Sequence, residues 1–253
     1  MSAQREMPFL SHIGELKRRL TWVALFFILT VGTSLAFHRH IIRFLVEPAE
    51  DLNAFTGGTL IFTDLTEFWG AAVKISVMTG ALVTLPFFSL QMSLFLGPGL
   101  SSTERRWLYL LMPFALLSFA GGIAFGYFIL IPPAISFLLN FAGDVATPLI
   151  RIGSYLNLVT MLLFWMGLSF ELPVVMFFVA KIGVATPQFF LSKFKYAVVG
   201  AFVVGAMITP TFDPFNQSLV AGPIIVLYLV GYLLARVGAK RDKSESTEIS
   251  PSA

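Results

Sequence analysis

The chain has 253 residues, of which 57% are hydrophobic and only 12% are charged, and its mean hydropathy is +0.83. A soluble domain carries about 25% charged residues, so this composition indicates a polytopic membrane protein. The lack of cysteine excludes disulfides, thiol catalysis and thiolate metal sites. The small net charge of +3, carried by residues that flank apolar runs, does not favour nucleic-acid binding.

Six apolar stretches are long enough, or nearly so, to cross a membrane as α-helices, which takes about 20 residues. The sequence therefore predicts an all-α fold whose spans cover about 20–37, 68–96, 107–131, 155–179, 196–208 and 215–234. Prolines are expected to stop the third span at Pro132-Pro133 and the fifth before Pro210. The fifth and sixth spans are expected to be short, and the fifth needs a locally thinned bilayer or shielding by its neighbours.

Basic residues set the orientation of these spans. If the N-terminus is cytoplasmic, 13 of the 17 Lys and Arg residues lie in cytoplasmic segments and three, Arg39, Arg43 and Arg151, lie in external ones. This bias fits the positive-inside rule, and six spans then place both termini in the cytoplasm. Residues 1–238 are expected to form a single membrane domain, and the polar segment 239–253 a disordered cytoplasmic tail. Within the external loop, the apolar run 41–46 suits a short helix at the interface.

Few polar groups interrupt the predicted spans, and Glu171 is the most unusual of them. A carboxylate at mid-membrane costs about 2.5–3.5 kcal/mol on insertion scales, so such a residue suggests a function. The alternative is a neutral carboxyl group hydrogen-bonded to a neighbouring helix. Pro173 frees a backbone carbonyl and predicts a bend near Glu171. Lys74, in the second span, is expected to reach the external interface or to pair with an acidic loop residue.

Two further patterns have simple structural explanations. Asp213 followed by Pro214 is typical of a helix start, with the aspartate as N-cap and the proline at the first helical position. Gly122 and Gly126 form a small-xxx-small pattern, which we interpret as close helix packing within the subunit. No phosphate-binding loop, His-Glu-x-x-His or Gly-x-Ser-x-Gly motif is present in the sequence, so no enzyme activity and no cofactor are predicted.

Two charged segments flank the spans on the predicted cytoplasmic side. They are His12-Ile-Gly-Glu-Leu-Lys-Arg-Arg-Leu20 and Phe95-Leu-Gly-Pro-Gly-Leu-Ser-Ser-Thr-Glu-Arg-Arg106. Topology explains their basic residues but not the acids Glu15 and Glu104, because acidic residues contribute little to orientation. Glu104 could instead pair with a following arginine or stabilise the N-terminus of the third helix.

These segments resemble the TatC family of the twin-arginine protein translocase, over nearly the whole chain. The first is similar to the family's His-Leu-x-Glu-Leu-Arg-x-Arg-Leu, from which Ile13 and Lys17 depart. The second resembles the family's first cytoplasmic loop. The family's fourth-helix motif is similar to Phe170-Glu-Leu-Pro173. Its last external turn is similar to the segment from Thr209-Pro210 through Gln217. The resemblance implies recognition of Arg-Arg signal peptides on the cytoplasmic face. The residues it points to for that role are Glu15, Glu104, Arg18, Arg19, Phe95 and Arg105.

The same resemblance implies partners and a location. Single-span subunits of the TatA and TatB types would contact the polar groups Glu171, Thr209, Asp213 and Gln217. Export of folded proteins would use the proton-motive force across a bacterial cytoplasmic membrane, with the subunit forming oligomers with itself. Two other functions remain open from the residues alone. One is a proton-coupled small-solute transporter that uses Glu171, against which the lack of an internal repeat argues; the other is a membrane scaffold that recognises no cargo.

Overall fold

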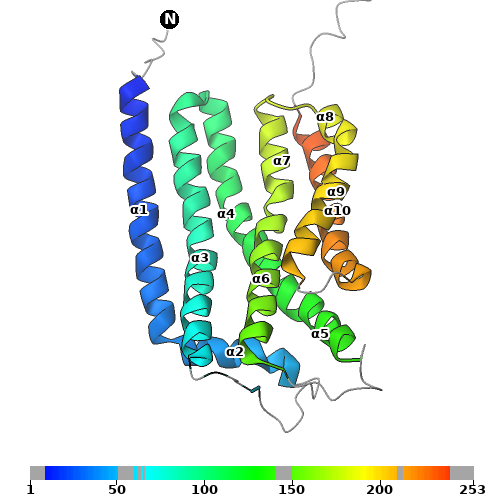
Figure 1. Ribbon diagram of the computed structural model, residues 1–253. Coiled ribbons are helices and arrows are strands. Elements are labelled where there is room, and N and C mark those ends of the chain that lie inside the picture. The colour runs from blue at the N-terminus through cyan, green and yellow to red at the C-terminus, as the bar shows by residue number, and fades with distance from the viewer. Residues whose placement is uncertain are drawn as a thin grey trace, which may run out of the picture.

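The protein is described by a computed structural model that covers residues 9–50, 60–61, 64, 66–140, 150–209 and 213–239 (Figure 1). Within these ranges the chain is almost entirely helical, apart from an isolated parallel bridge between Ile61 and Arg151. The α-helices are α1 (Phe9–Ala36), α2 (His38–Glu50), α3 (Glu67–Leu96), α4 (Ser102–Phe125), α5 (Ile131–Asn140), α6 (Ile152–Phe170), α7 (Leu172–Lys181), α8 (Pro187–Ser192), α9 (Phe194–Ile208) and α10 (Pro214–Gly238). A 3-10 turn, η1 (Gly97–Gly99), follows α3, and a π-helical segment, η2 (Gly126–Leu130), follows α4.

The predicted six spans are present. Five helical segments are long and apolar enough to cross a membrane, and α9 is a shorter apolar helix of 15 residues. The sixth span was also expected to be short, over 215–234, but α10 has 25 residues and continues to Gly238. α1 begins and α10 ends at the same end of the bundle, as an even number of spans requires (Figure 1). The segment 239–253 was expected to be a disordered tail, and all of it after Ala239 lies outside the described residues.

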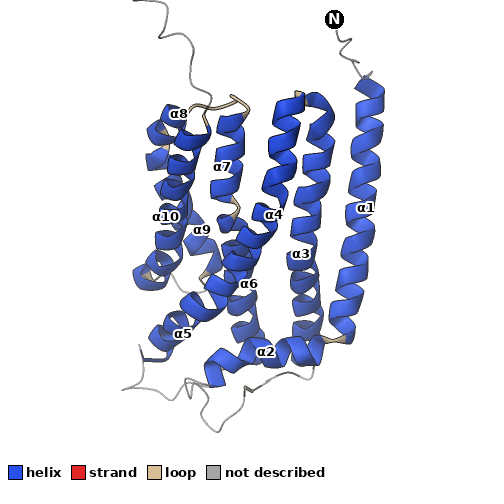
Figure 2. Ribbon diagram, turned by 180° about the vertical axis from the view of Figure 1, so that it is seen from behind, coloured by secondary structure: helices blue, strands red, loops and turns tan. Residues whose placement is uncertain are grey.

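The third span does not stop at Pro132-Pro133 as predicted. The chain passes from α4 through η2 into α5 and stays helical to Asn140, changing direction on the way (Figure 2). α5 begins at Ile131, so both prolines fall in its first turn. In a first turn a missing N–H breaks no helical hydrogen bond, and the fixed φ of proline suits the helix. The proline pair therefore stands in the first turn of α5, directly after the π-helical segment η2, and does not end the helical run.

The fourth span divides where the sequence predicts a bend. α6 ends at Phe170, α7 begins at Leu172, and Glu171 lies at the junction. Pro173 occupies the first turn of α7. The interruption leaves the Glu171 side chain beside a locally broken backbone ladder, which explains how a carboxyl group is accommodated in this apolar segment.

α2 lies across the end of the bundle opposite the beginning of α1, roughly perpendicular to α1 and α3 (Figures 1 and 2). Its residues Ile42, Leu45 and Val46 are buried. Two tyrosines fix it, because the hydroxyl of Tyr127 donates to the carbonyl of Phe44 and that of Tyr155 to the carbonyl of Leu45, each at 2.7 Å. The short helix predicted over 41–46 is thus confirmed and extends further on both sides.

The centre of the bundle is the contact between α4 and α6. A Cβ atom at Gly122 would lie 2.6 Å from the backbone oxygen of Met166, and one at Gly126 would lie 3.1 Å from a methyl group of Leu163. The two glycines therefore allow the close packing within the subunit that their spacing predicts. α1, in contrast, stands at the edge of the bundle beside α3 (Figure 1).

Candidate functional site

Near the beginning of α1, the contact between α1 and α3 holds an arginine bound to a carboxylate and an amide. Glu15 and Arg19 lie one helical turn apart on α1, and both Nε and Nη2 of Arg19 donate to Oε1 of Glu15, the former at 3.0 Å. Nη1 of the same guanidinium donates across to Oε1 of Gln91 on α3 at 3.4 Å. Each side chain of the ion pair is only 16% exposed. The guanidinium therefore joins the two helices in a partly desolvated setting, where charge-assisted hydrogen bonds are stronger than in water.

An aromatic contact lies one turn nearer the beginning of α1. The rings of His12 on α1 and Phe95 on α3 stack with centroids 4.3 Å apart and an interplanar angle of 20°. Residues 12 and 15, like residues 91 and 95, are about one turn apart, so this stack lies next to the Glu15–Arg19–Gln91 cluster, on the side nearer the beginning of α1. Phe95, which the sequence assigns to the site, is thus brought beside Glu15.

Glu104 has a structural role as well as a candidate functional one. Ser101 is the N-cap of α4, and its hydroxyl accepts a hydrogen bond from the backbone N–H of Glu104 at 3.4 Å. The carboxylate of Glu104 accepts in turn from the N–H of Ser101 at 3.1 Å. This reciprocal pattern is the capping box that a Ser-x-x-Glu sequence favours. Arg105 donates from Nε to the carbonyl of Gly97 at 2.9 Å and so fastens the turn between α3 and α4.

The two acids share one end of the molecule but not one helix contact. The α3–α4 turn and the beginning of α1 lie at the same end of the bundle, and α3 stands between α1 and α4 (Figure 1). Glu104 is half-buried, whereas Lys17, Arg18 and Arg106 are exposed and form no ion pair with any residue that the structure describes. The geometry brings Glu15, Arg19 and Phe95 together and places Glu104 and Arg105 on the neighbouring turn.

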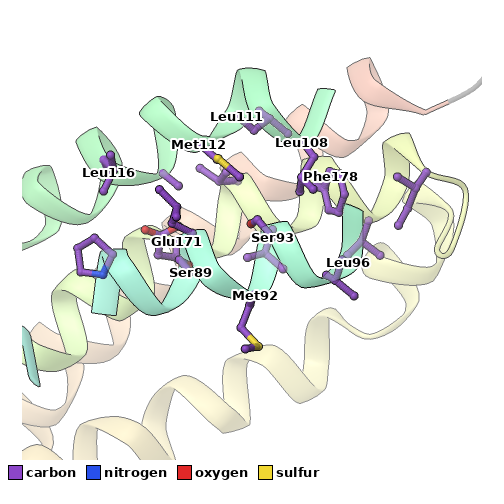
Figure 3. A pocket seen from close by; sticks show the side chains of 17 residues that line it. Ser89, Met92, Ser93, Leu96, Leu108, Leu111, Met112, Leu116, Glu171 and Phe178 are labelled. Atoms are coloured by element: carbon purple, nitrogen blue, oxygen red, sulfur yellow. The ribbon is translucent and has the colours of Figure 1, made fainter. Parts of the chain in front are cut away.

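Glu171 lines a separate cavity of about 300 Å³ between α3, α4 and α7 (Figure 3). Most of the lining is aliphatic, and Figure 3 shows Ser89 and Ser93 facing the cavity from α3. The Glu171 carboxyl group makes no hydrogen bond or ion pair with any described residue. Of the two interpretations of Glu171, hydrogen bonding to a neighbouring helix therefore finds no support among these residues.

The remaining predicted polar residues lie at the end of α9 and the beginning of α10, and Gln217 joins the two helices. Thr209 is buried, and its hydroxyl donates to the carbonyl of Gly205 at 2.9 Å. Nε2 of Gln217 on α10 donates to the carbonyl of Phe202 on α9, also at 2.9 Å. Asp213 caps α10 as predicted, accepting from the backbone N–H of Asn216 at 2.7 Å. The turn that joins the helices falls partly on residues 210–212, which lie outside the described chain.

Sequence reasoning missed Gln91 as well as the serines of the cavity. A signal for them exists, because Ser89, Gln91 and Ser93 are the polar interruptions near the end of an otherwise apolar span. Which of them faces α1 and which faces the cavity depends on the rotation of α3 about its axis, and the sequence alone does not give that rotation. Lys74 is exposed and pairs with no described residue.

Six helical spans, both described ends of the chain on one side and a carboxylate-bearing face there define a multi-pass membrane protein without a nucleotide-binding motif. Comparison with protein families then identifies the group to which it belongs. Residues 11–223 match the family model described as Sec-independent protein translocase protein (TatC), so the chain is a member of the TatC family. Members of this family are named as translocase components, which is a role in transport.

Curated relatives and a solved structure agree with this assignment. The chain is 32% identical over 90% of its length to the Sec-independent protein translocase protein TatC of Koribacter versatilis, and covers 84% of that protein. It is 34% identical to the Aquifex aeolicus TatC over 94% of this chain and 98% of the relative. A crystal structure of the twin arginine translocase receptor TatC superimposes with a TM-score of 0.81 at 33% identity, covering 90% of this chain and 99% of the other.

Proposed function

We propose that this protein is the receptor and core subunit of a twin-arginine translocase, and that it binds Arg-Arg signal peptides at its cytoplasmic face. The observation that carries the proposal is the Glu15 carboxylate, which already holds a guanidinium in a partly desolvated setting. A site that accepts one guanidinium has the chemistry to accept another. Membership of a translocase family supports the same function.

Two acceptors suit two consecutive arginines. Glu15 and the carboxylate of Glu104 would each take one guanidinium, through hydrogen bonds that are charge-assisted and directional. Phe95, stacked on His12, would form an apolar wall beside the first acceptor. Arg19 would pair with Glu15 in the resting protein, Arg105 would hold the α3–α4 turn in place, and Arg18 would add to the charge pattern of the face. A lysine ammonium lacks the planar fork of arginine, so the pair is expected to discriminate against Lys-Lys.

The membrane-embedded polar groups are the proposed contacts for partner subunits. An unpaired carboxyl group in an apolar cavity is costly in lipid, so a polar side chain from a single-span TatA- or TatB-type helix would be stabilised beside Glu171. Thr209, Asp213 and Gln217 would form a second such contact at the α9–α10 corner. Export would be driven by the proton-motive force, in a bacterial cytoplasmic membrane, by an assembly that also contains further copies of this subunit.

The test is binding of a fluorescent twin-arginine signal peptide to the purified protein in nanodiscs, followed by anisotropy. A peptide with Lys-Lys in place of Arg-Arg serves as the control ligand, and the Glu15→Gln/Glu104→Gln double variant as the control protein. We expect selective binding of the Arg-Arg peptide and its loss in the double variant. Equal binding of both peptides, or binding that survives in the double variant, contradicts the receptor function.

A further inference from the structure

We infer that Glu15 and Gln91 together form the subsite for one signal-peptide arginine, and that Arg19 occupies this subsite until the peptide displaces it. The inference rests on the proposed receptor function and adds to it a specificity-determining residue, Gln91. The guanidinium of Arg19 shows how the subsite holds its ligand. Nε and Nη2 use Oε1 of Glu15, while Nη1 uses Oε1 of Gln91.

The arrangement of the acceptors explains why arginine fits. Glu15 and Gln91 approach the guanidinium from two different helices, α1 and α3, and contact different nitrogens of its fork. A guanidinium carries five N–H donors in one rigid plane, so it reaches both acceptors without distortion. A lysine ammonium is a compact point charge with three donors on one atom. Lysine can satisfy Glu15, but it lacks the separated donor that the guanidinium directs at Gln91.

Binding is then an exchange of one arginine for another. The incoming guanidinium gains the Glu15 and Gln91 contacts, and Arg19 loses the same two. Arg19 lies beside Lys17 and Arg18, which are exposed and unpaired in the described chain, so the released side chain can turn into solvent as they do. The displacement weakens every ligand of the subsite by the same factor, whereas Gln91 favours only ligands with a fork. Arg19 therefore sets the affinity, and Gln91 sets part of the preference for arginine over lysine.

Four proteins in nanodiscs separate these two roles: wild type, Arg19→Met, Lys17→Met, and Arg19→Met combined with Gln91→Leu. Methionine keeps the length of the arginine stem but carries no donor. Lys17→Met makes the same change in net charge on the adjacent exposed residue, so it measures the general electrostatic effect. Leucine keeps the volume of Gln91 without an acceptor. Dissociation constants for the Arg-Arg and Lys-Lys peptides are measured for each protein, together with its thermal midpoint.

We expect Arg19→Met to bind both peptides more tightly by the same factor, roughly two- to fivefold beyond the effect of Lys17→Met, which is the range of a partly exposed ion pair. In that background, Gln91→Leu is expected to weaken the Arg-Arg peptide at least about tenfold, the loss of one hydrogen bond to a charged group, and to leave the Lys-Lys peptide unchanged. Gln91→Glu, which restores an acceptor, is expected to recover the preference for arginine. Thermal midpoints near that of the wild type show that the variants fold.

Weaker binding of the Arg-Arg peptide by Arg19→Met overturns the inference, because Arg19 would then help to hold the ligand. An equal loss for both peptides on Gln91→Leu also overturns it, since Gln91 would then act only through the packing of α3. Both results differ from failure of the receptor function itself. In that case wild-type protein shows no Arg-Arg preference, or Glu15→Gln alone leaves its binding intact.

Discussion

Glu104 carries two tasks in one side chain. Its carboxylate closes the capping box at the start of α4, and the same group is the proposed acceptor of a signal arginine. A truncation at this position therefore mixes a loss of helix stability with a loss of binding. Glutamine separates the two, because its side-chain oxygen also completes a capping box while its charge is zero.

Glu104→Gln is accordingly expected to weaken binding of the Arg-Arg peptide at least about tenfold, as a charge-assisted pair becomes a neutral hydrogen bond. Its thermal midpoint should remain close to that of the wild type. Glu104→Ala should lose the binding and also about 0.5–2 kcal/mol of the free energy of unfolding, the usual cost of a lost cap. Peptide titration and thermal unfolding in the same detergent provide both numbers. Full binding by Glu104→Gln would show that Glu104 acts only as a cap.

Glu171 differs from Glu104 in that its carboxyl group forms no hydrogen bond or ion pair with any described residue. Glu171→Ala is expected to leave the affinity for the signal peptide within about twofold of the wild type. The amount of a TatA- or TatB-type partner that co-purifies with the protein should change, because the polar contact within the membrane is gone. Ser93→Ala, which alters the same cavity without removing an acid, is the control. Loss of signal binding in the purified variant would refute this division of labour.

At the scale of the element, the contact between α4 and α6 depends on one of two adjacent glycines. A Cβ at Gly122 would lie 2.6 Å from the backbone oxygen of Met166, whereas one at Gly121 meets nothing within 4 Å. Gly122→Ala should therefore force the helices apart, at a cost of roughly 1–3 kcal/mol in the free energy of unfolding. Gly121→Ala should leave stability unchanged or raise it, because alanine is the better helix former. Thermal unfolding of the two variants compares them directly, and equal midpoints would contradict the packing argument.

The sequence predicts the elements well where composition alone decides them. Six apolar runs give six spans, and Pro173 marks the break beside Glu171. The predicted end of the third span at Pro132-Pro133 was wrong. A proline pair can end a helix that precedes it, but it also suits the first turn of a helix that follows, and α5 is such a helix. Periodicity within one segment does not tell these cases apart.

Within the candidate site, the contacts inside one helix could be predicted from the sequence, whereas the contact between two helices could not. The spacing of Glu15 and Arg19 is i to i+4, so their pairing could have been inferred from α1 alone. Gln91 reaches the same guanidinium from a helix more than 70 positions away in the chain. That contact depends on the rotation and offset of α3 against α1, which arise from packing. The cap at Asp213 was predictable because the backbone N–H that it accepts from, on Asn216, lies within one turn.

For the whole molecule, the unequal lengths of the spans imply an uneven membrane boundary. α9 has 15 residues, which at 1.5 Å per residue is about 22 Å, against a hydrocarbon core of about 30 Å. α1, at the other edge of the bundle, has 28 residues. The lipid beside α9 must therefore thin, or a neighbouring subunit must cover the helix.

Stability is consequently expected to depend on bilayer thickness. The purified protein should unfold at a higher temperature in nanodiscs of short-chain phosphatidylcholine than in those of long-chain phosphatidylcholine, by a few degrees for a cost of about 1 kcal/mol. The matched control extends α9 by three leucines after Gly200, which should shift the optimum to thicker bilayers. A melting temperature that does not change with chain length would contradict the mismatch.

The contact between Arg19 and Glu15 also affects how the proposed receptor would respond to positively charged segments other than its own signal peptides. Ordinary export signals carry positively charged leading segments and pass the same membrane surface. A side chain held one helical turn from its carboxylate competes at an effective concentration in the millimolar range or above, whereas a stray cationic segment is far more dilute. Under the inferred exchange, Arg19 weakens the binding of every cationic segment by the same factor, so a weak ligand leaves the subsite largely empty at concentrations where a tight twin-arginine ligand still fills it.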